Sequence, residues 1–238
     1  MINFFRKKRK KLADDNKTLK YTRYAIGEIV LVVLGILIAL QINNWNQAKK
    51  ERVREISLLK ELKINLQTNI HNLEMDITTQ IESEHHIKRL IYYIDNKLPY
   101  NDSIPFFLTR GGYAPDVILT SSAFETLKTS GIGLIKSDSL RQNIIGLFEV
   151  SYPYLMQNTR RLEDQLWPAV VIPLTQKHCR VVNGLWVPVD YELMINDQEF
   201  LNMWTLRETL RRVSTTIKKK TVKETMLTIE LIDKTLKR

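Results

Sequence analysis

The hydrophobic pattern divides the chain into one apolar run and a long amphipathic region. Residues 24–45, YAIGEIVLVVLGILIALQINNW, carry a single charged side chain, Glu28. As a helix this run is roughly 33 Å long, which matches the roughly 30 Å hydrocarbon core of a bilayer. It begins later than the apolar part of a signal peptide, is longer, and lacks a small-residue cleavage site. The pattern therefore predicts an uncleaved transmembrane helix.

Aromatic residues stand at both ends of this predicted span. Tyr21 and Tyr24 lie at its start and Trp45 lies at its end. Tyr and Trp rings favour the level of the lipid headgroups, because one end of each ring is apolar and the other is polar. We therefore expect these three residues to anchor the helix at the two membrane interfaces.

Glu28 needs an explanation, because an ionisable group in hydrocarbon costs several kcal/mol. Two interpretations remain open. Glu28 lies about one turn from the start of the span, where its carboxylate can reach the headgroups. Alternatively, it shares a helical face with Gly35 and Ala39, a pair of small residues that lets two helix backbones approach closely. On this second interpretation Glu28, Gly35 and Ala39 form a surface for association between spans.

After the span, apolar residues recur with a helical period. Their spacing alternates between three and four positions: Leu59, Leu62, Leu66, Ile70, Leu73, Ile77 and Ile81. Because neither Gly nor Pro occurs between Gly35 and Pro99, one helix is predicted to run from the membrane to about Asn96. The apolar stripe fits a core face within one subunit and a coiled-coil seam between subunits equally well.

The middle of the chain contains residues that interrupt helices. Pro99, Pro105, the pair Gly111-Gly112 and Pro115 indicate a loop or connector. A short helix is predicted at 123–130, because Ser122 and Glu125 have the spacing of a capping box.

Further signals place the remaining helices of this part. Gly131 is a natural end for the short helix. Ser137 or Asp138 begins a longer helix that reaches about Trp167 and is interrupted at Pro153.

The last third of the chain predicts a hairpin followed by a long helix. Asn183-Gly184 between apolar runs is typical of a type I′ turn. A second capping box, Asn196 to Glu199, precedes a stretch without Gly or Pro that reaches about Leu236. Its apolar side is predicted to contain Phe200, Met203, Leu206, Leu210, Val213 and Ile217. The predicted fold is mainly α: a transmembrane helix that continues into a long helix, and an antiparallel helical bundle with a small β-hairpin.

The net charge of +10 is concentrated before the span. Residues 1–23 carry nine Lys or Arg against Asp14 and Asp15, a net charge of +7, and Glu28 subtracts one, so residues 46–238 carry +4. Because positive flanks stay in the cytoplasm, we predict a basic cytoplasmic arm at 1–23, a transmembrane helix at 24–45 and a periplasmic domain at 46–238, on the inner membrane.

The same distribution argues against nucleic-acid binding, which favours a basic stripe on the folded domain. The basic residues of the final helix are interpreted as a solvated face, with an anionic partner as the alternative: Arg207, Arg211, Arg212, Lys218, Lys219, Lys220 and Lys223.

Residues with catalytic or metal-binding chemistry are sparse. His85-His86 and His178-Cys179 are adjacent pairs, and neighbours on a helix point about 100° apart instead of sharing a face. Glu163 and Asp164 are interpreted as solvated acids. No nucleophile or phosphate-binding motif occurs. We therefore predict no catalytic, cofactor or metal site, and a protein that is not an enzyme.

The apolar segment and its basic arm carry a family resemblance. MINFFRKKRKK followed by YAIGEIVLVVLGILIALQINNWN resembles the N-terminal signature of an uncharacterised domain-of-unknown-function family of small single-span membrane proteins, frequent in Bacteroidota. SSAFETLKTSGIGLIKSDSLR is similar to a second, looser pattern of that family. The resemblance implies an inner-membrane anchor with a helical domain beyond it and no known activity. The family-like positions are Glu28, Gln41, Asn43, Asn44 and Trp45.

Two functions fit these observations. The first is a membrane-anchored helical scaffold that forms a homo-oligomer within the lipid bilayer and presents its outer domain to another envelope protein. The alternative is a single-span sensor whose outer helices, around 104–190, bind a small ligand or peptide. A scaffold requires an exposed apolar patch, and a sensor requires a concave pocket with converging polar groups.

Overall fold

The computed structural model describes residues 18–113 and 117–237, and side chains from Thr22 onward except those at 161 and 162. The chain forms two compact units, Met1–Arg54 and Glu55–Arg238. The basic arm up to residue 17 and the side chain of Tyr21 lie outside what is described, so these two predictions stay predictions.

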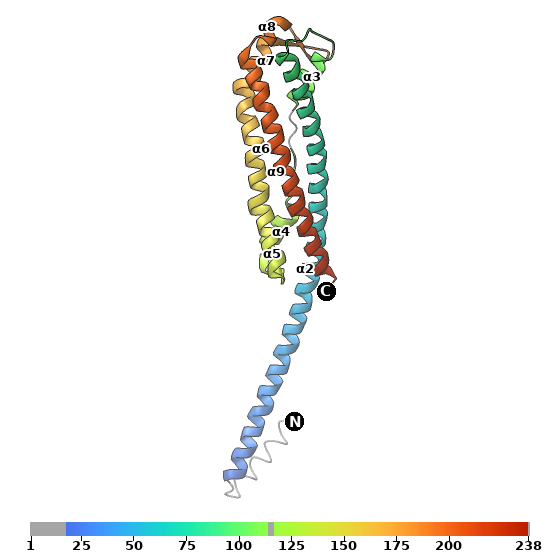
Figure 1. The fold of residues 1–238 in the computed structure, drawn as a ribbon. Coiled ribbons are helices and arrows are strands. Elements are labelled where there is room, and N and C mark those ends of the chain that lie inside the picture. Colours follow the sequence, from blue (N-terminus) through green and yellow to red (C-terminus); the bar gives the residue numbers. More distant parts are fainter. Residues whose placement is uncertain (1–17, 114–116, 238) are drawn as a thin grey trace. The chain divides into compact units, whose positions relative to one another are not determined.

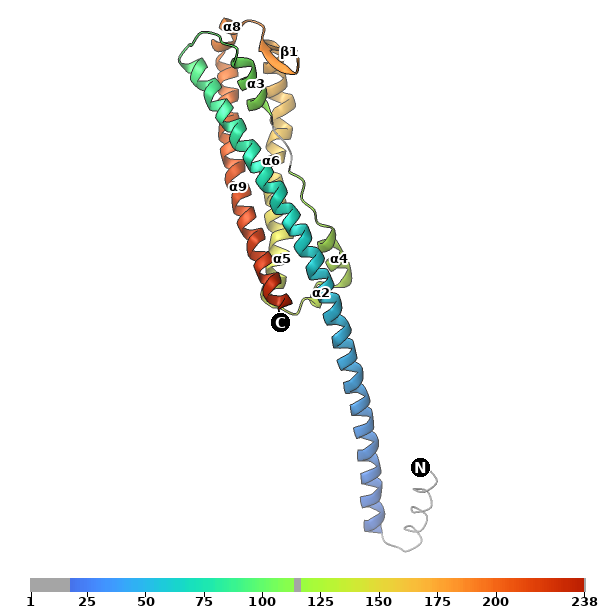
Figure 2. The same ribbon diagram turned by 90° about the vertical axis from the view of Figure 1, so that its right-hand side faces the viewer.

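The long first helix is confirmed. α2 runs unbroken over Thr18–Asp95. In the first unit every side chain at residues 29–50 is exposed, including the apolar run. Figure 1 and Figure 2 show the helix from two sides.

The second unit is a helical bundle with three long helical stretches: residues 55–95 of α2, a segmented stretch, and α9. The segmented stretch consists of α5 (Asp138–Ile145), η2 (Gly146–Ser151), α6 (Tyr152–Leu166), η3 (Trp167–Val171) and α7 (Ile172–His178). α9 spans Gln198–Leu236. The remaining elements are α3 (Ile104–Gly112), α4 (Ser122–Ser130), η1 (Ile132–Leu134), β1 (Cys179–Val182), β2 (Leu185–Pro188) and α8 (Tyr191–Ile195). The predicted mainly α fold with one hairpin is confirmed.

Prolines explain why the segmented stretch is not one regular helix. η2 is a wide, π-type turn that ends two residues before Pro153. η3 is a second one, which contains Pro168 and ends two residues before Pro173. Proline lacks an N–H group and its ring clashes with the carbonyl one turn earlier, so the helix widens locally. The interruption predicted at Pro153 is confirmed, and the helical stretch continues beyond Trp167 to His178.

The hairpin and several helix ends match their local signals. Val182 pairs with Leu185, and Asn183 and Gly184 have φ of 50° and 77°, as a type I′ turn requires. Ser137 caps α5 by accepting a hydrogen bond from the Leu140 N–H. The helix α4 ends at Gly131, whose φ is 93°.

Both predicted capping boxes are wrong in detail. The side chain of Asp197, instead of Asn196, caps α9 by accepting from the N–H groups of Glu199 and Phe200. At α4 the cap comes from another helix, because Asn65 Oδ1 accepts from the Ala123 N–H at 3.0 Å.

Further along α2, the side-chain amide of Asn69 makes two hydrogen bonds to the backbone of Thr120. Thr120 N donates to Asn69 Oδ1 at 2.6 Å, and Asn69 Nδ2 donates to Thr120 O at 2.9 Å. The connector before α4 is thus fixed along α2 by asparagine side chains.

α2 and α9 pack antiparallel within the second unit, as predicted. Lys63 of α2 pairs with Asp233 near the end of α9 at 2.6 Å. Asp76, further along α2, pairs with Lys218, which lies earlier in α9.

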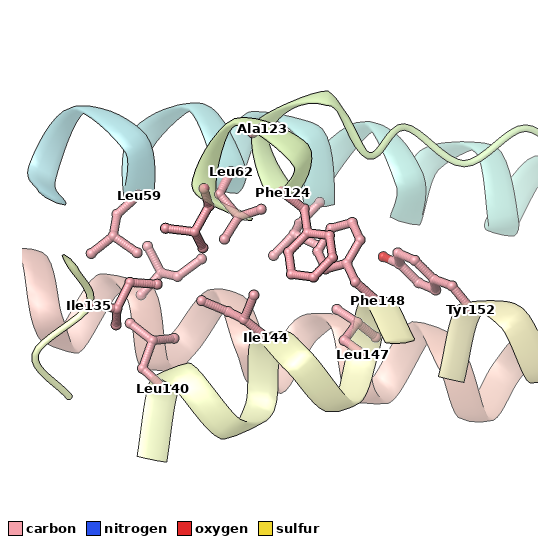
Figure 3. Packing of buried hydrophobic residues seen from close by; sticks show 13 residues of the cluster. Leu59, Leu62, Ala123, Phe124, Ile135, Leu140, Ile144, Leu147, Phe148 and Tyr152 are labelled. Atoms are coloured by element: carbon pink, nitrogen blue, oxygen red, sulfur yellow. The ribbon is translucent and has the colours of Figure 1, made fainter. Parts of the chain in front are cut away.

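The apolar core lies mainly at the two ends of this bundle. At the end near Glu55, Phe124 of α4 stacks on Phe148 of η2 with ring centroids 4.4 Å apart, against Leu59 and Leu62 of α2 (Figure 3). At the other end, Ile87 of α2 packs with residues of α3, α8 and the first turns of α9, including Phe200 and Trp204.

The stripe predicted on the first long helix is mostly a core face within the chain. Leu59, Leu62, Leu66, Leu73 and Ile77 are buried in the second unit. The prediction is wrong at Ile81, which is 45% exposed. The buried seam instead continues through the polar residues Asn69, Asp76, Gln80 and Ser83. Burial in the middle of α2 therefore follows position on the helix and not hydrophobicity.

A similar exchange occurs on α9. Phe200 and Met203 are buried as predicted, but Leu206 and Val213 are 46% and 44% exposed. Their sequence neighbours Arg207 and Ser214 are buried in their place. The polar side of α9 therefore faces the bundle, opposite the polar part of α2.

Candidate functional site

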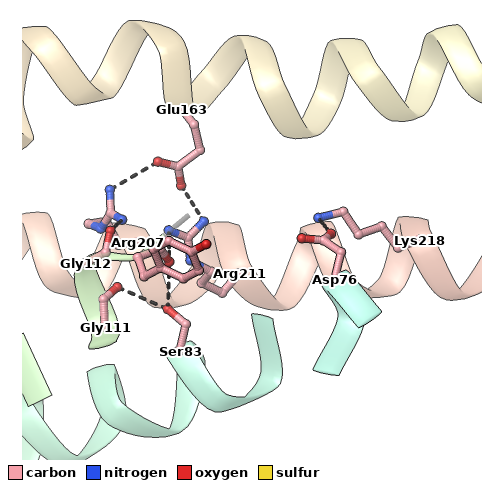
Figure 4. Close-up of polar contacts among 9 residues, drawn as sticks. Asp76, Ser83, Gly111, Gly112, Glu163, Arg207, Arg211 and Lys218 are labelled. Carbon is pink, nitrogen blue, oxygen red and sulfur yellow. Dashed lines mark hydrogen bonds and ion pairs between the residues drawn. The ribbon is translucent and has the colours of Figure 1, made fainter. Parts of the chain in front are cut away.

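A buried ionic layer occupies the middle of the bundle (Figure 4). Glu163 of α6 lies between two arginines of α9: its Oε2 is 3.1 Å from Arg207 Nη1 and its Oε1 is 2.7 Å from Arg211 Nη1. The arginine side chains are 0% and 2% exposed, and that of Glu163 is 17% exposed. One carboxylate thus bridges two guanidinium groups that are removed from water.

The C-terminus of α3 supplies further acceptors to this layer. Arg207 Nη2 donates to the carbonyl of Gly112 at 2.9 Å, and Arg211 Nη2 donates to that of Tyr113 at 3.3 Å. Ser83 Oγ of α2 donates to the Gly111 carbonyl at 3.1 Å. The last carbonyls of a helix lack partners within the helix and carry partial negative charge, so the arginines both satisfy and neutralise them.

Two glycines allow α3 to approach this closely. A Cβ atom on Gly112 would lie 2.5 Å from the Trp186 ring, and one on Gly111 would lie 2.9 Å from Ile87 Cγ1. The pair Gly111-Gly112, which predicted only a connector, is therefore required for close packing at the end of a helix.

Aromatic rings enclose the Arg207 guanidinium. Its Cζ lies 5.3 Å from the centroid of Trp167 and 5.9 Å from that of Trp204. Burial lowers the pKa of Arg207 to about 10, and Glu163 opposes that shift by stabilising the charge. Arg207 therefore remains a cation at neutral pH, held by cation–π contacts as well as by its ion pair.

A second buried pair lies beside the first. Asp76 of α2 and Lys218 of α9 form an ion pair, and both side chains are at most 6% exposed. Asp76 also acts electrostatically on Arg211. The layer therefore connects α2, α6, α9 and the end of α3.

The predicted solvated face of the final helix is confirmed for four of its residues: Arg212, Lys219, Lys220 and Lys223 are exposed. It is wrong for Arg207, Arg211 and Lys218, which are buried, and the same interpretation is wrong for Glu163. Arg207, Arg211 and Lys218 share one face of the helix, with the spacing that apolar residues have in a buried seam. This spacing is the sequence signal that indicates their burial. Charge by itself suggested solvent, because charged side chains are rarely buried unless paired. Asp164 is exposed, as predicted.

A histidine and a lysine meet an aspartate at the start of α9, and a buried cysteine follows the histidine in sequence. His178 Nε2 lies 2.7 Å from Asp197 Oδ2, and Lys177 Nζ lies 2.6 Å from the same oxygen. The Lys177 ammonium group holds the pKa of Asp197 well below its usual range. Burial raises the pKa of the Cys179 thiol to about 12. Because the thiol stays protonated at neutral pH, the arrangement lacks an activated nucleophile.

The outer face of α9 borders two adjoining grooves. One, of about 410 Å³, lies between η2 and α9, and the next, of about 320 Å³, continues between α6 and α9. Both are lined by Val150, Ser151 and Glu224. Val150 is 64% exposed, and the π-type turn η2 forms part of the wall. Such turns often occur at functional sites.

The residues predicted for the span all lie on α2 in the first unit. Trp45 is 70% exposed and Glu28 is half-buried. The space where a Cβ atom on Gly35 would lie is open, and Ala39 is exposed on the same face. Within the described chain, α2 is long and apolar enough to cross a membrane by length and composition.

Candidate metal ligands do not cluster in the described chain. No group of three or more His, Cys, Asp or Glu side chains comes together at residues 22–113 and 117–237.

Comparison with known proteins assigns the chain to a family. Residues 28–209 match the Family of unknown function (DUF6090). The chain belongs to this family. The matched region begins at Glu28 and contains Glu163 and Arg207 of the ionic layer. No curated protein and no solved structure matches the chain.

Proposed function

We propose that this DUF6090 protein is a membrane-anchored helical scaffold that assembles with copies of itself. The observation that supports it most directly is the exposure of every side chain at residues 29–50 in a helix of this apolar character. Exposed apolar surface of that extent favours a lipid environment over water. The resemblance to single-span inner-membrane proteins of Bacteroidota supports the same location.

In this proposal residues 1–23 lie in the cytoplasm, 24–45 span the inner membrane and 46–238 lie in the periplasm. The charge of the N-terminal arm supports this orientation. Alkaline phosphatase fused after Arg238 is expected to be active, and the same reporter fused after Thr22 is expected to be inactive. The reverse pattern contradicts the topology.

Self-association is expected to involve the span as well as the outer domain. The face that carries Glu28, Gly35 and Ala39 is a candidate for helix contact, with Tyr21, Tyr24 and Trp45 at the interfaces. Replacing Gly35 and Ala39 by Leu separates two helices that pack closely. The larger apolar side chains do not restore the association, because lipid is as apolar as leucine and gives no hydrophobic driving force. Native mass spectrometry of the full chain in mild detergent should show a weaker oligomer. A monomeric parent protein contradicts self-association.

The outer domain supports the role of a scaffold through its exposed apolar surface beside α9. A scaffold can also present such a surface to another envelope protein. The grooves next to η2 favour a second candidate, a single-span sensor that binds a small ligand or peptide. Pull-down of the full chain with mass spectrometry separates the two, because a scaffold recovers another envelope protein, whereas a sensor recovers a small ligand or a peptide.

A further inference from the structure

Three buried oxygen atoms in the middle of the bundle have no hydrogen-bond partner among the described residues. They are Asp76 Oδ1 and Gln80 Oε1 of α2 and Thr215 Oγ1 of α9. The three residues are 6%, 2% and 6% exposed, so solvent at the surface does not reach them. Buried polar atoms in native proteins are almost always hydrogen-bonded, and each of these atoms therefore requires a partner inside the bundle.

The hydroxyl group of Thr215 differs from those of other buried threonines in α9. The hydroxyl groups of Thr221, Thr225 and Thr228 each donate to the carbonyl oxygen four residues earlier in the helix. This bond is the usual one for a threonine within a helix. Thr215 Oγ1 does not make it. Its hydroxyl group is thus available to a group that lies between the helices.

The three oxygen atoms lie at neighbouring levels of the seam between α2 and α9. The ion pair of Asp76 with Lys218 fixes the register of the two helices at this point. Gln80 lies one turn after Asp76 on α2, and Thr215 lies about one turn before Lys218 on α9. Because the helices are antiparallel, both steps lead in the same direction along the seam. Gln80 and Thr215 therefore face each other at the same level.

Arg211 supplies a hydrogen-bond donor to this part of the seam. It lies one turn before Thr215, and its Nε–H group has no acceptor among the described residues. Asp76 acts on it electrostatically, and Figure 4 shows Arg211 and the Asp76–Lys218 pair at successive positions along α9. The seam thus combines two acceptors, one donor and a hydroxyl group that can be either.

We infer that the seam between α2 and α9 holds one ordered water molecule, bound by Asp76, Gln80, Arg211 and Thr215. A water molecule donates two hydrogen bonds and accepts two, and a buried one typically makes about three. It can donate to Asp76 and Gln80 and accept from Arg211 and Thr215. A cation fits less well, because the Lys218 ammonium group already lies against Asp76.

Such a water connects the two parts of the ionic layer. Asp76 belongs to the pair with Lys218, and Arg211 belongs to the pair with Glu163. The bound water joins both pairs in one hydrogen-bonded network across α2, α9 and α6. The water site depends neither on the membrane anchor nor on self-association, so its failure leaves the proposed function untouched.

A crystal structure of the full chain in detergent, at a resolution that shows ordered water, tests the site directly. The expected result is a water molecule within about 3.2 Å of both Gln80 Oε1 and Thr215 Oγ1. A direct hydrogen bond between these two side chains overturns the inference. A Thr215 hydroxyl group that donates to the Arg211 carbonyl, with no water between the helices, overturns it as well.

Thr215→Val gives a second readout, because valine keeps the shape of threonine and removes the hydroxyl group. Loss of a hydrogen bond to the bound water should raise the unfolding equilibrium constant of the full chain in mild detergent about fivefold. Without a partner for the hydroxyl group, the same substitution should lower that constant, which overturns the inference. Thr228→Val is the matched control, since Thr228 is equally buried and bonds to its own helix. Its effect should stay within about twofold.

A double variant tests whether Gln80 and Thr215 bind the same water. Once Thr215→Val has weakened the water, Gln80→Met has less to remove. The double variant should therefore raise the unfolding equilibrium constant by clearly less than the product of the two single effects. Gln80→Met combined with Thr228→Val should give the full product. A full product in both cases overturns the shared site, and circular dichroism checks that every variant is folded.

Discussion

Two segments of the same helix, α2, reverse the usual relation between hydrophobicity and burial. Residues 24–45 are the most apolar part of the chain, and from residue 29 onward their side chains are exposed. Residues 69–83 include Asn69, Asp76, Gln80 and Ser83, and these are buried. The apolar side chains of the first segment from residue 29 onward are exposed, and exposed apolar surface of this extent favours lipid over water. The second is surrounded by groups that pair with its polar side chains. Burial is therefore decided by available partners as well as by hydropathy.

The largest expected effect concerns the apolar segment. Val33→Arg combined with Leu37→Arg places two charges near the middle of the span, where each costs about 2.5–3.5 kcal/mol. The variant should leave the membrane fraction on alkaline extraction. Ile64→Arg is the matched control, because Ile64 is 61% exposed on the same helix and is expected to have no effect. Retention of the double variant contradicts a transmembrane role for 24–45.

The next effect concerns the polar segment of the bundle. Glu163→Gln leaves Arg207 and Arg211 buried without their shared carboxylate, and breaking a buried pair in this way costs about 3–5 kcal/mol. Chemical denaturation of the full chain in mild detergent should show this loss. Asp164→Asn is the control, because that side chain is 67% exposed, and its effect should stay below about 0.5 kcal/mol. Equal stability of the two variants would show that the ionic layer contributes little.

A smaller effect tests the approach of α3 to the same layer. In Gly112→Ala the new methyl group would lie 2.5 Å from the Trp186 ring, so the ring or the helix must move. Overpacking of this kind costs about 1–3 kcal/mol in the free energy of unfolding. At Gly133 no atom lies within 4 Å of the new methyl group. Gly133→Ala should therefore leave the thermal midpoint unchanged or slightly raised, and a similar loss at both positions contradicts the packing argument.

The smallest effect is a dependence on pH at the start of α9. Lys177 lowers the pKa of Asp197 in the folded protein, so the ionised carboxylate stabilises the fold. This stabilisation is fully present above the pKa of an unfolded aspartate, about 3.9. It is lost as the pH falls through the pKa of the folded state. Asp197→Asn should cost about 1 kcal/mol at pH 7, and the difference from the parent should shrink towards pH 3. Unfolding free energies at both pH values measure it.

Asp102→Asn, at an exposed position, serves as the control for this series and should follow the parent at every pH. A difference between the parent and Asp197→Asn that stays constant from pH 7 to pH 3 would show that the ion pair does not stabilise the fold.

Sequence alone determined the order and type of most elements, because their signals are local. The absence of Gly and Pro predicted both long helices, the turn residues Asn183 and Gly184 predicted the hairpin, and Pro153 predicted the interruption. Each of these signals acts on the backbone of its own or the next few residues. α3 was missed because Pro105 and Gly111-Gly112 suggested a connector, whereas proline is tolerated in the first turn of a helix.

Only the tertiary structure decided which face of each helix is buried. Leu206 and Arg207 are neighbours in sequence, and hydropathy favours burial of the leucine, but the arginine is the buried one. The outcome depends on Glu163 and on the end of α3, which are 44 and 95 residues away in sequence. In the same way, the cap of α4 comes from Asn65, 58 residues earlier. A buried charge or an unpaired N–H group is stable only where a distant segment supplies its partner, and that pairing arises when the chain folds.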